Sequence, residues 1–111
     1  MAVTVKVLVP SKTAESSQTT QYTASNVTTI LDKFTATNYS ATAATLSVNL
    51  VTVAGTAGND NLITKTKTLQ PAEVYTFPEI VGQVLGIGDF ISTIAGTATS
   101  INIRASGREV T

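Results

Sequence analysis

The sequence predicts an all-β fold, a sandwich or small barrel of about seven or eight short strands. Threonine is the most abundant residue, and valine, isoleucine and alanine supply most of the apolar mass. Such β-branched side chains suit a pleated, half-buried surface. Apolar and polar residues alternate in several short runs, which is the period of a strand. Turn signals rich in glycine, proline and asparagine separate these runs every ~8–12 residues.

The N-terminal segment begins with the strand Val3–Val9, which has valines on one face and Thr4 and Lys6 on the other. Pro10 is expected to close this strand, because a proline cannot donate to a strand ladder. The polar stretch Ser11–Gln18 that follows is predicted to be a loop.

Three longer strands follow. Thr28–Asn38 is predicted as a strand with a turn or bulge at the charged pair Asp32-Lys33. Ala44–Val53 shows the clearest alternation, and in Leu62–Leu69 threonines alternate with lysines, as in a solvent-facing or edge strand. The other expected segments are the strands Thr19–Thr23 (a short strand or extended edge), Val74–Phe77, Phe90–Ala95 and Ser100–Ala105, and a helical turn or irregular crossing at Glu79–Leu85.

The chain of 111 residues fits one domain, and we expect residues 1–111 to form a single β-sandwich. Residues 1–18 are expected to act as an N-terminal strand and arm. No secretory signal and no run long enough for a membrane span are present, so synthesis in the cytoplasm is expected.

The composition argues against several classes of function. The chain has no histidine and no cysteine, which removes the commonest general base, the commonest zinc ligand and every disulfide. Its net charge is zero and only 13% of its residues are charged, so it lacks a footprint for nucleic acid or for anionic lipid. A neutral surface with few charges favours association with other proteins.

Two short motifs invite a reading as sites. Asn59-Asp60-Asn61 resembles a fragment of a calcium loop but lacks the other acidic ligands, so a turn supported by Asx side chains is favoured. Gly86-Ile87-Gly88-Asp89 lacks the third glycine and the Lys-Ser/Thr pair of a nucleotide loop, which favours a tight turn with Asp89 bonded to backbone. We therefore expect no enzyme activity, no catalytic residue, no metal and no cofactor.

The second half of the chain carries a recognisable pattern. It reads T-N-Y-S-A-T-A-A-T-L-S-V-N-L-V from residue 37, L-Q-P-A-E-V-Y-T-F-P-E-I-V-G-Q-V-L-G-I-G-D-F-I-S-T-I-A from residue 69, and I-N-I-R-A-S-G-R-E-V-T at the end. This pattern resembles small structural proteins of tailed bacteriophages, described as neck or collar, tail or capsid decoration proteins. The residues that carry it are Asn38, Ser40, Pro71, Glu73, Tyr75, Leu85, Gly88, Asp89, Ile91, Arg104, Ser106, Gly107 and Glu109.

The resemblance implies an immunoglobulin-like β-sandwich of about seven to eight short antiparallel strands that works in many copies on a virion. Its implied partners are itself, in a ring or array, and a connector, tail or major capsid protein, and its implied place of synthesis is the cytoplasm of the host bacterium. Within this class, a place in the neck, collar or tail is expected ahead of capsid decoration. A carbohydrate- or receptor-binding sandwich is the alternative from another class, and it should show exposed aromatic residues on a loop rim.

Sheet edges are the expected contact surfaces, because an unpaired strand can complete its sheet with a neighbouring subunit. Our hypothesis is that the first strand and the last strand, near 104–110, lie at edges and make subunit contacts. The tyrosines are candidates because a phenol can be buried on one side and bonded on the other. The candidate interface residues are Val3, Val5, Val7, Tyr39, Tyr75, Arg104, Arg108 and Glu109.

Overall fold

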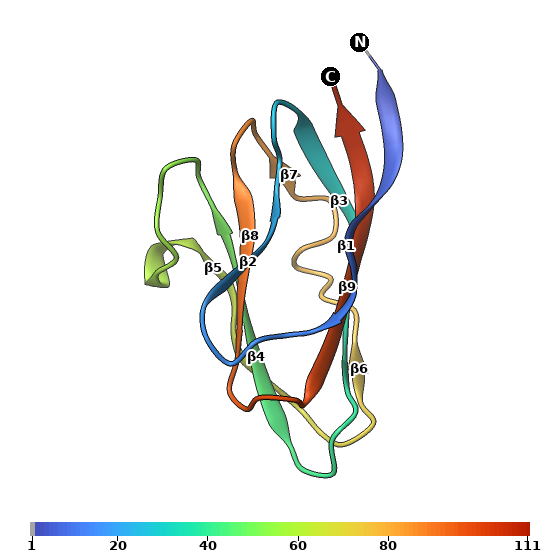
Figure 1. The fold of residues 1–111 in the computed structure, drawn as a ribbon, viewed down its shortest axis with the longest axis vertical. Helices are drawn as coiled ribbons and strands as arrows, with labels where there is room; N and C mark the ends of the chain where they lie inside the picture. Colours follow the sequence, from blue (N-terminus) through green and yellow to red (C-terminus); the bar gives the residue numbers. More distant parts are fainter. Residues whose placement is uncertain (1) are drawn as a thin grey trace.

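The computed structural model, which describes residues 2–111, is a sandwich of two antiparallel sheets (Figure 1). Sheet A has the order β1-β9-β3-β6, with β7 also paired to β3, and sheet B has the order β2-β8-β4-β5. The strands are β1 (Val3–Thr13), β2 (Thr19–Thr23), β3 (Thr28–Asn38), β4 (Ala44–Val51), β5 (Leu62–Leu69), β6 (Val74–Tyr75), β7 (Val84–Leu85), β8 (Phe90–Ala95) and β9 (Ile101–Val110), and a 3-10 turn covers Asn59–Asn61.

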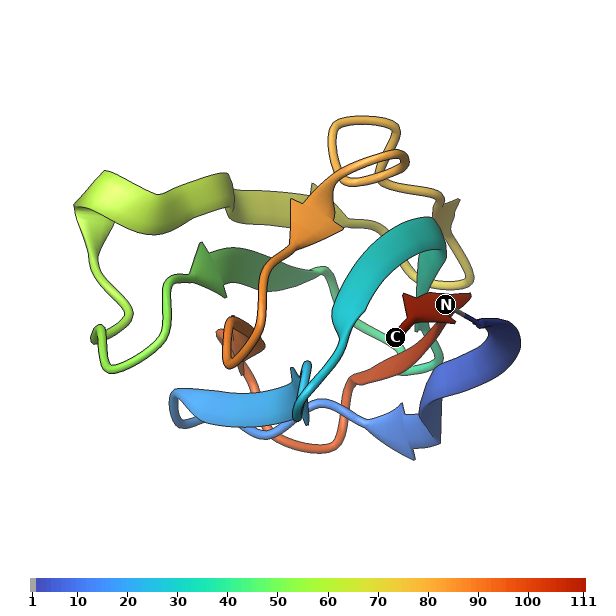
Figure 2. The ribbon, with the colours of Figure 1, turned by 90° about the horizontal axis from the view of Figure 1, so that it is seen from above.

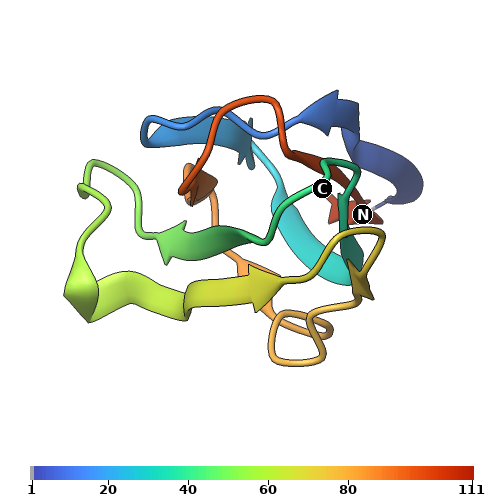
Figure 3. The same ribbon diagram turned by 90° about the horizontal axis from the view of Figure 1, so that it is seen from below.

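The chain changes sheets several times, so its two layers are covalently interwoven. Seen from above, the sheets face each other, with β1 and β2 along one side and β5 and β6 along the other (Figure 2). The view from below shows the connection from β3 to β4 crossing between the layers (Figure 3). The core between the sheets is apolar, and its largest fully buried side chains are Phe34, Phe77, Leu31, Leu46, Leu69, Ile80, Leu85, Ile91, Ile101, Ile103, Val9 and Val48.

The first strand is longer than the sequence indicated. β1 continues through Pro10 to Thr13, so the predicted end at Pro10 is wrong. The physical reason is its position: β1 is the edge of sheet A, and a proline at an edge can turn its missing N–H toward solvent. Register shifts between Val7 and Val9 and between Val9 and Lys12 bend the strand around the core.

The last strand corrects our edge hypothesis. β9 extends to Val110 and lies between β1 and β3, so it is an interior strand. The predicted end of this strand at Ala105 is wrong, because the strand continues past Gly107, which is buried in the middle of sheet A. A Cβ at Gly107 would collide with the carbonyl oxygen of Ile30 and stand 2.9 Å from Leu8 Cδ1. Glycine is therefore required here by close approach of the strands.

Two other local predictions are confirmed. The β3–β9 register shifts between Leu31 and Lys33, which is the bulge expected at Asp32-Lys33. β5 has the predicted bounds and lies at the edge of sheet B. The crossing at 79–85 is irregular and ends in the two-residue strand β7, while Ile80 is buried in the core.

The glycine bend before β8 also forms as expected. Gly88 has a positive φ of 86°, which glycine adopts without steric cost. The Asp89 carboxylate accepts hydrogen bonds from the backbone N–H groups of Gly86 (2.9 Å) and Val53 (2.9 Å). The motif is thus a turn that joins the loop after β4 to the start of β8.

Replacing Gly107 with alanine should destabilise the fold by about 3 kcal/mol or more, because the added methyl group meets backbone that cannot move without breaking the sheet. Urea unfolding would measure the change. The neighbouring Ser106→Ala variant is the matched control and should cost much less, since Ser106 already carries a Cβ. An unchanged midpoint in Gly107→Ala would contradict the close approach of β9 to β3.

Candidate assembly surface

The free edge of β1 is the longest unpaired strand edge among residues 2–111. β1 pairs only with β9, whereas the other edge strands are shorter. Ala2 and Thr111 exchange both backbone hydrogen bonds (3.3 and 2.9 Å), so they are a hydrogen-bonded pair. Antiparallel ladders alternate hydrogen-bonded and non-hydrogen-bonded pairs. With the unbroken register from Val3 to Val7, this alternation leaves the N–H and C=O groups of Val3, Val5 and Val7 pointing away from β9.

The same three valines are exposed at their side chains. Val3, Val5 and Val7 are 56%, 83% and 42% exposed, whereas Leu8 and Val9, beyond the register shift, are buried. The valines share one face of the strand because side chains alternate. That face is the outer surface of sheet A, because Lys6 on the opposite face reaches Glu109 beside the core.

The exposed valines continue across sheet A as an apolar row. Val5 lies opposite Arg108, Arg108 opposite Ile30, and Ile30 opposite Val84, so all four share the outer face. Val84 is 57% exposed and Ile30 is partly exposed. Arg108 crosses this row with its charge neutralised, since its guanidinium donates to both carboxylate oxygens of Asp32 at 2.9 and 3.0 Å. We name Val3, Val5, Val7, Ile30 and Val84 the outer apolar row.

The inner side of the β1 edge is held by a polar network. The Tyr22 hydroxyl donates to Glu109 (2.5 Å) and accepts from Thr29 (2.7 Å), and Lys6 Nζ donates to Glu109 at 3.3 Å. The hydrogen bond from Tyr22 lowers the pKa of Glu109. Burial, together with the neighbouring carboxylate, raises the pKa of Tyr22 to about 12. The network therefore joins β2, β3 and β9 with Glu109 ionised and Tyr22 neutral.

The predicted interface residues do not gather at one place. Val3, Val5, Val7 and Arg108 lie together on the outer face of sheet A. Arg104 shares that face but lies farther along β9, opposite Thr35. Glu109 belongs to the inner network rather than to the exposed surface.

The two candidate tyrosines lie away from the β1 valines. Tyr39 follows β3 at the opposite end of sheet A, is 50% exposed, and its hydroxyl lies 3.1 Å from Thr13 Oγ1. Tyr75 is partly buried at the β5–β6 side, where its hydroxyl donates to Glu79 at 2.8 Å. Lys67 Nζ stands 4.6 Å above the Tyr75 ring. Tyr75 thus closes one side of the core. Of the two tyrosines, Tyr39 is the more exposed to solvent.

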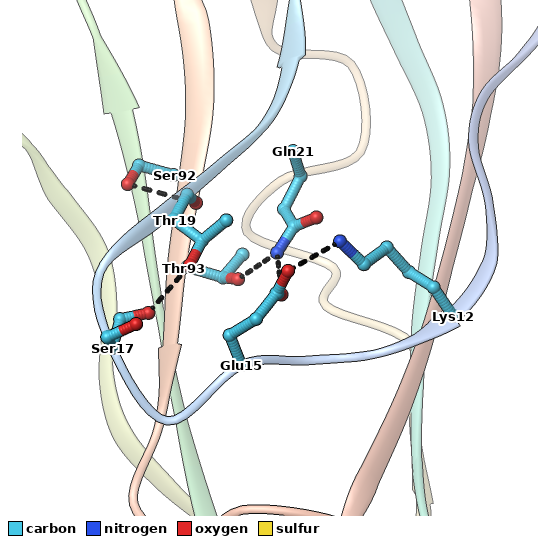
Figure 4. A network of polar contacts seen from close by, with 7 residues as sticks. All are labelled: Lys12, Glu15, Ser17, Thr19, Gln21, Ser92 and Thr93. Atoms are coloured by element: carbon cyan, nitrogen blue, oxygen red, sulfur yellow. Dashed lines mark hydrogen bonds and ion pairs between the residues drawn. The ribbon is translucent and has the colours of Figure 1, made fainter.

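The other side of the sandwich is closed by a polar network where the chain passes from β1 to β2 (Figure 4). Glu15 accepts hydrogen bonds from Lys12 (2.8 Å) and Gln21 (2.9 Å), and Gln21 also donates to Thr93 at 3.0 Å. The bond from Lys12 lowers the pKa of Glu15, so this carboxylate is poorly suited to act as a general acid near neutral pH. The hydrogen bonds of Glu15 and Gln21 instead connect the β1–β2 segment to β8.

A shallow hollow on the outer face of sheet B is lined by polar and apolar residues, among them Asn49, Lys65 and Leu62. The Asn49 side chain in this lining is already engaged by hydrogen bonds within the protein. The Asn49 amide donates to Asn61 Oδ1 (2.7 Å) and to the Gly58 carbonyl (3.0 Å), and accepts from Gln18 at 3.3 Å. Asn61 therefore holds the loop of the Asn59-Asp60-Asn61 motif by amide contacts. This fits the expected Asx-supported turn.

Several of the residues that carry the resemblance hold turns, while others lie within β6, β7, β8 and β9. Asn38 is fully buried, donates to the carbonyl oxygens of Thr42 and Leu69 (both 2.9 Å), and accepts from the backbone N–H of Ser40. Glu73 accepts from the backbone N–H of Gln70 at 2.7 Å. Their roles here are architectural, as is that of Asp89 in the bend before β8.

Within residues 2–111, no group of three or more acidic side chains is placed to hold a metal ion. No helix in the same range is long and apolar enough to cross a membrane.

Reasoning from the sequence found the valines of β1 but missed Ile30 and Val84. The valine alternation was a local signal. The other two residues join the outer apolar row only through the pairing of β3 with β9 and β7, which no local pattern specifies. The network of Tyr22 and Glu109 was missed for the same reason, since these residues are 87 positions apart.

Replacing Glu109 with glutamine should lower the free energy of unfolding at pH 7 by about 1 kcal/mol, because a charged acceptor of the partly buried Tyr22 hydroxyl is lost. The pKa of Glu109 is lowered by folding, so its contribution is present above the ordinary value of 4.5 and is lost as the pH falls through the folded-state pKa. The difference between wild type and variant should therefore shrink below about pH 4.5 in urea titrations. Asp60→Asn, in an exposed loop, is the control; a gap that stays constant down to pH 3 would refute the network.

Comparisons with known proteins give no family or homologue: no family model, no curated protein and no solved structure matches this chain.

Proposed function

We propose that this chain is a non-enzymatic structural protein of a tailed bacteriophage virion, assembled in multiple copies. The observation that carries the proposal is the free edge of β1, where three neighbouring valines have both unpaired backbone groups and exposed side chains. The resemblance of residues 35–111 to phage structural proteins supplies the setting.

An unpaired edge of this kind is a liability for a protein that functions alone. Natural sheets protect their edges with lysine, proline or bulges. β1 has its proline and register shifts only after Val7, and its one lysine in the first half, Lys6, is held by Glu109. Zero net charge adds little repulsion between copies. In a protein that functions as part of an assembly, a neighbouring subunit can cover this edge.

The head-to-tail region (neck or collar) or the tail is the proposed location, and capsid decoration is the alternative within the same class. Both use a small sandwich that binds its own copies or a connector, tail or major capsid protein. The copy number separates them: about a dozen or fewer copies per ring in the neck or tail, against hundreds on a capsid.

A carbohydrate- or receptor-binding module is less well supported. Such a module would need exposed aromatic rings gathered on a loop rim. Among the described residues, Tyr39 is the one aromatic side chain that is highly exposed, and it has no aromatic neighbour in contact. The hollow on sheet B includes Asn49, whose amide is engaged by the protein itself.

Quantitative mass spectrometry of virions purified from the phage that carries this gene tests the proposal. The chain should be present at a fixed ratio to the portal protein, about one or a few rings per particle for a neck or tail subunit. A replication protein of the same phage serves as the control and should be absent. Finding the chain only in the infected-cell lysate, and not in particles, would overturn the proposal.

A further inference from the structure

We propose that the β1 edge binds the β1 edge of a second copy of this chain, antiparallel, with a two-fold axis passing at Val5. The two A sheets then become one continuous sheet. This inference rests on the proposed function in one respect, that the edge is a subunit contact, and it names the partner and the register of that contact.

The hydrogen-bonding pattern of the edge is self-complementary. Outward N–H and C=O groups belong to Val3, Val5 and Val7, at every second residue. In an antiparallel pair, two such residues facing each other exchange both of their hydrogen bonds. Placing Val5 opposite Val5 of the second copy also places Val3 opposite Val7 and Val7 opposite Val3. All three outward residues are then satisfied on both copies, by ~6 hydrogen bonds.

Neighbouring registers form fewer hydrogen bonds between the two copies. A shift by one residue sets each outward valine against a residue already bonded to β9, and no ladder forms. Pairing Val5 with Val7 of the second copy loses one hydrogen-bonded pair and sets Lys6 directly opposite Lys6, where like charges repel. Pairing Val3 with Val5 loses one pair as well. The register centred on Val5 sets Lys6 opposite the neutral Thr4.

The side chains and the limits of the edge agree with this register. The valines of both copies lie on the outer face, so Val5 packs beside Val5 and the two outer apolar rows become continuous. The charge of Lys6, on the other face, is already neutralised by Glu109 at 3.3 Å. The register shift after Val7 bends the strand away from a straight ladder. The paired segment is therefore residues 3–7, which the two-fold arrangement uses completely.

A two-fold pair also satisfies the edge better than a head-to-tail ring through sheet A. The opposite edge of that sheet consists of the two-residue strands β6 and β7. The bond from the Leu31 N–H to the Gln83 carbonyl (2.9 Å) makes Val84 the outward residue of β7. A β1–β7 contact would thus form ~2 hydrogen bonds with that strand. The self-pairing of β1 closes on itself and leaves no second β1 edge.

Single cysteines test the register directly, because the chain has no native cysteine. In the proposed pair, residue 5 faces its own copy at a Cα separation of about 5.5 Å, within reach of a disulfide. Residue 3 lies ~13 Å along the strand from its own copy, which is too far. Val5→Cys should form a covalent dimer under mild oxidation and Val3→Cys should not, while a mixture of Val3→Cys and Val7→Cys should form a heterodimer.

Proline variants test whether the edge drives association without cross-linking. Val5→Pro removes an N–H that points away from β9, so the fold should survive while the β1–β1 ladder is interrupted. In sedimentation experiments, wild type should approach twice its 11.5 kDa mass with rising concentration, and Val5→Pro should stay at 11.5 kDa. Val84→Pro is the matched control on the opposite edge and should still dimerise. Circular dichroism verifies that each variant is folded.

The outcomes separate this inference from the proposed function. Equal cross-linking of Val3→Cys and Val5→Cys, none by either, or loss of association in Val84→Pro with Val5→Pro unaffected would overturn the two-fold pairing. Presence of the chain in virions would still support the structural role in that case. A Val5-centred dimer from a chain absent from virions would uphold the pairing and refute the virion role.

Discussion

Strand β9 is the element on which the rest of the structure depends, because it hydrogen-bonds to β1 on one side and β3 on the other. It directs Ile101, Ile103 and Ala105 into the core and brings Gly107 against the backbone of β3. This double pairing places β1 at the rim of sheet A. The exposed valines are thus a consequence of the interior position of β9: the strand order leaves one long edge of the sheet unpaired.

The two sides of the sandwich are closed by different means. On the β1–β2 side, the chain crosses between the sheets and Lys12, Glu15 and Gln21 bond across the gap. On the β5–β6 side, Glu79 accepts hydrogen bonds from Tyr75 and Thr64, and Phe77 packs against Phe34 at a centroid distance of 4.9 Å. Most clusters of ionisable side chains therefore link the two sheets at the sides of the sandwich. The outer apolar row and the β1 edge take no part in these links.

Local pattern was sufficient to predict much of the fold but little of its assembly. Leu62–Leu69 was predicted with its observed bounds, as a solvent-facing or edge strand, and the bulge at Asp32-Lys33 was predicted from a charged pair that interrupts an apolar run. The predicted strand ends at Pro10 and Ala105 were wrong because both depend on strand order: a proline is tolerated at an edge, and Gly107 continues an interior strand where the backbones pack closely. Strand order arises from long-range pairing, which alternation does not encode.

In the proposed pair, the unpaired backbone groups of Val3, Val5 and Val7 are satisfied by a neighbouring copy of the chain. Amide hydrogen exchange across β1 at increasing protein concentration tests this pairing most directly. In dilute solution, the amides of Thr4 and Lys6 should be protected by β9 and those of the three valines should exchange rapidly. At high concentration the valine amides should become protected as well. Valine amides that are protected in dilute solution, or that stay unprotected at every concentration, would contradict the account.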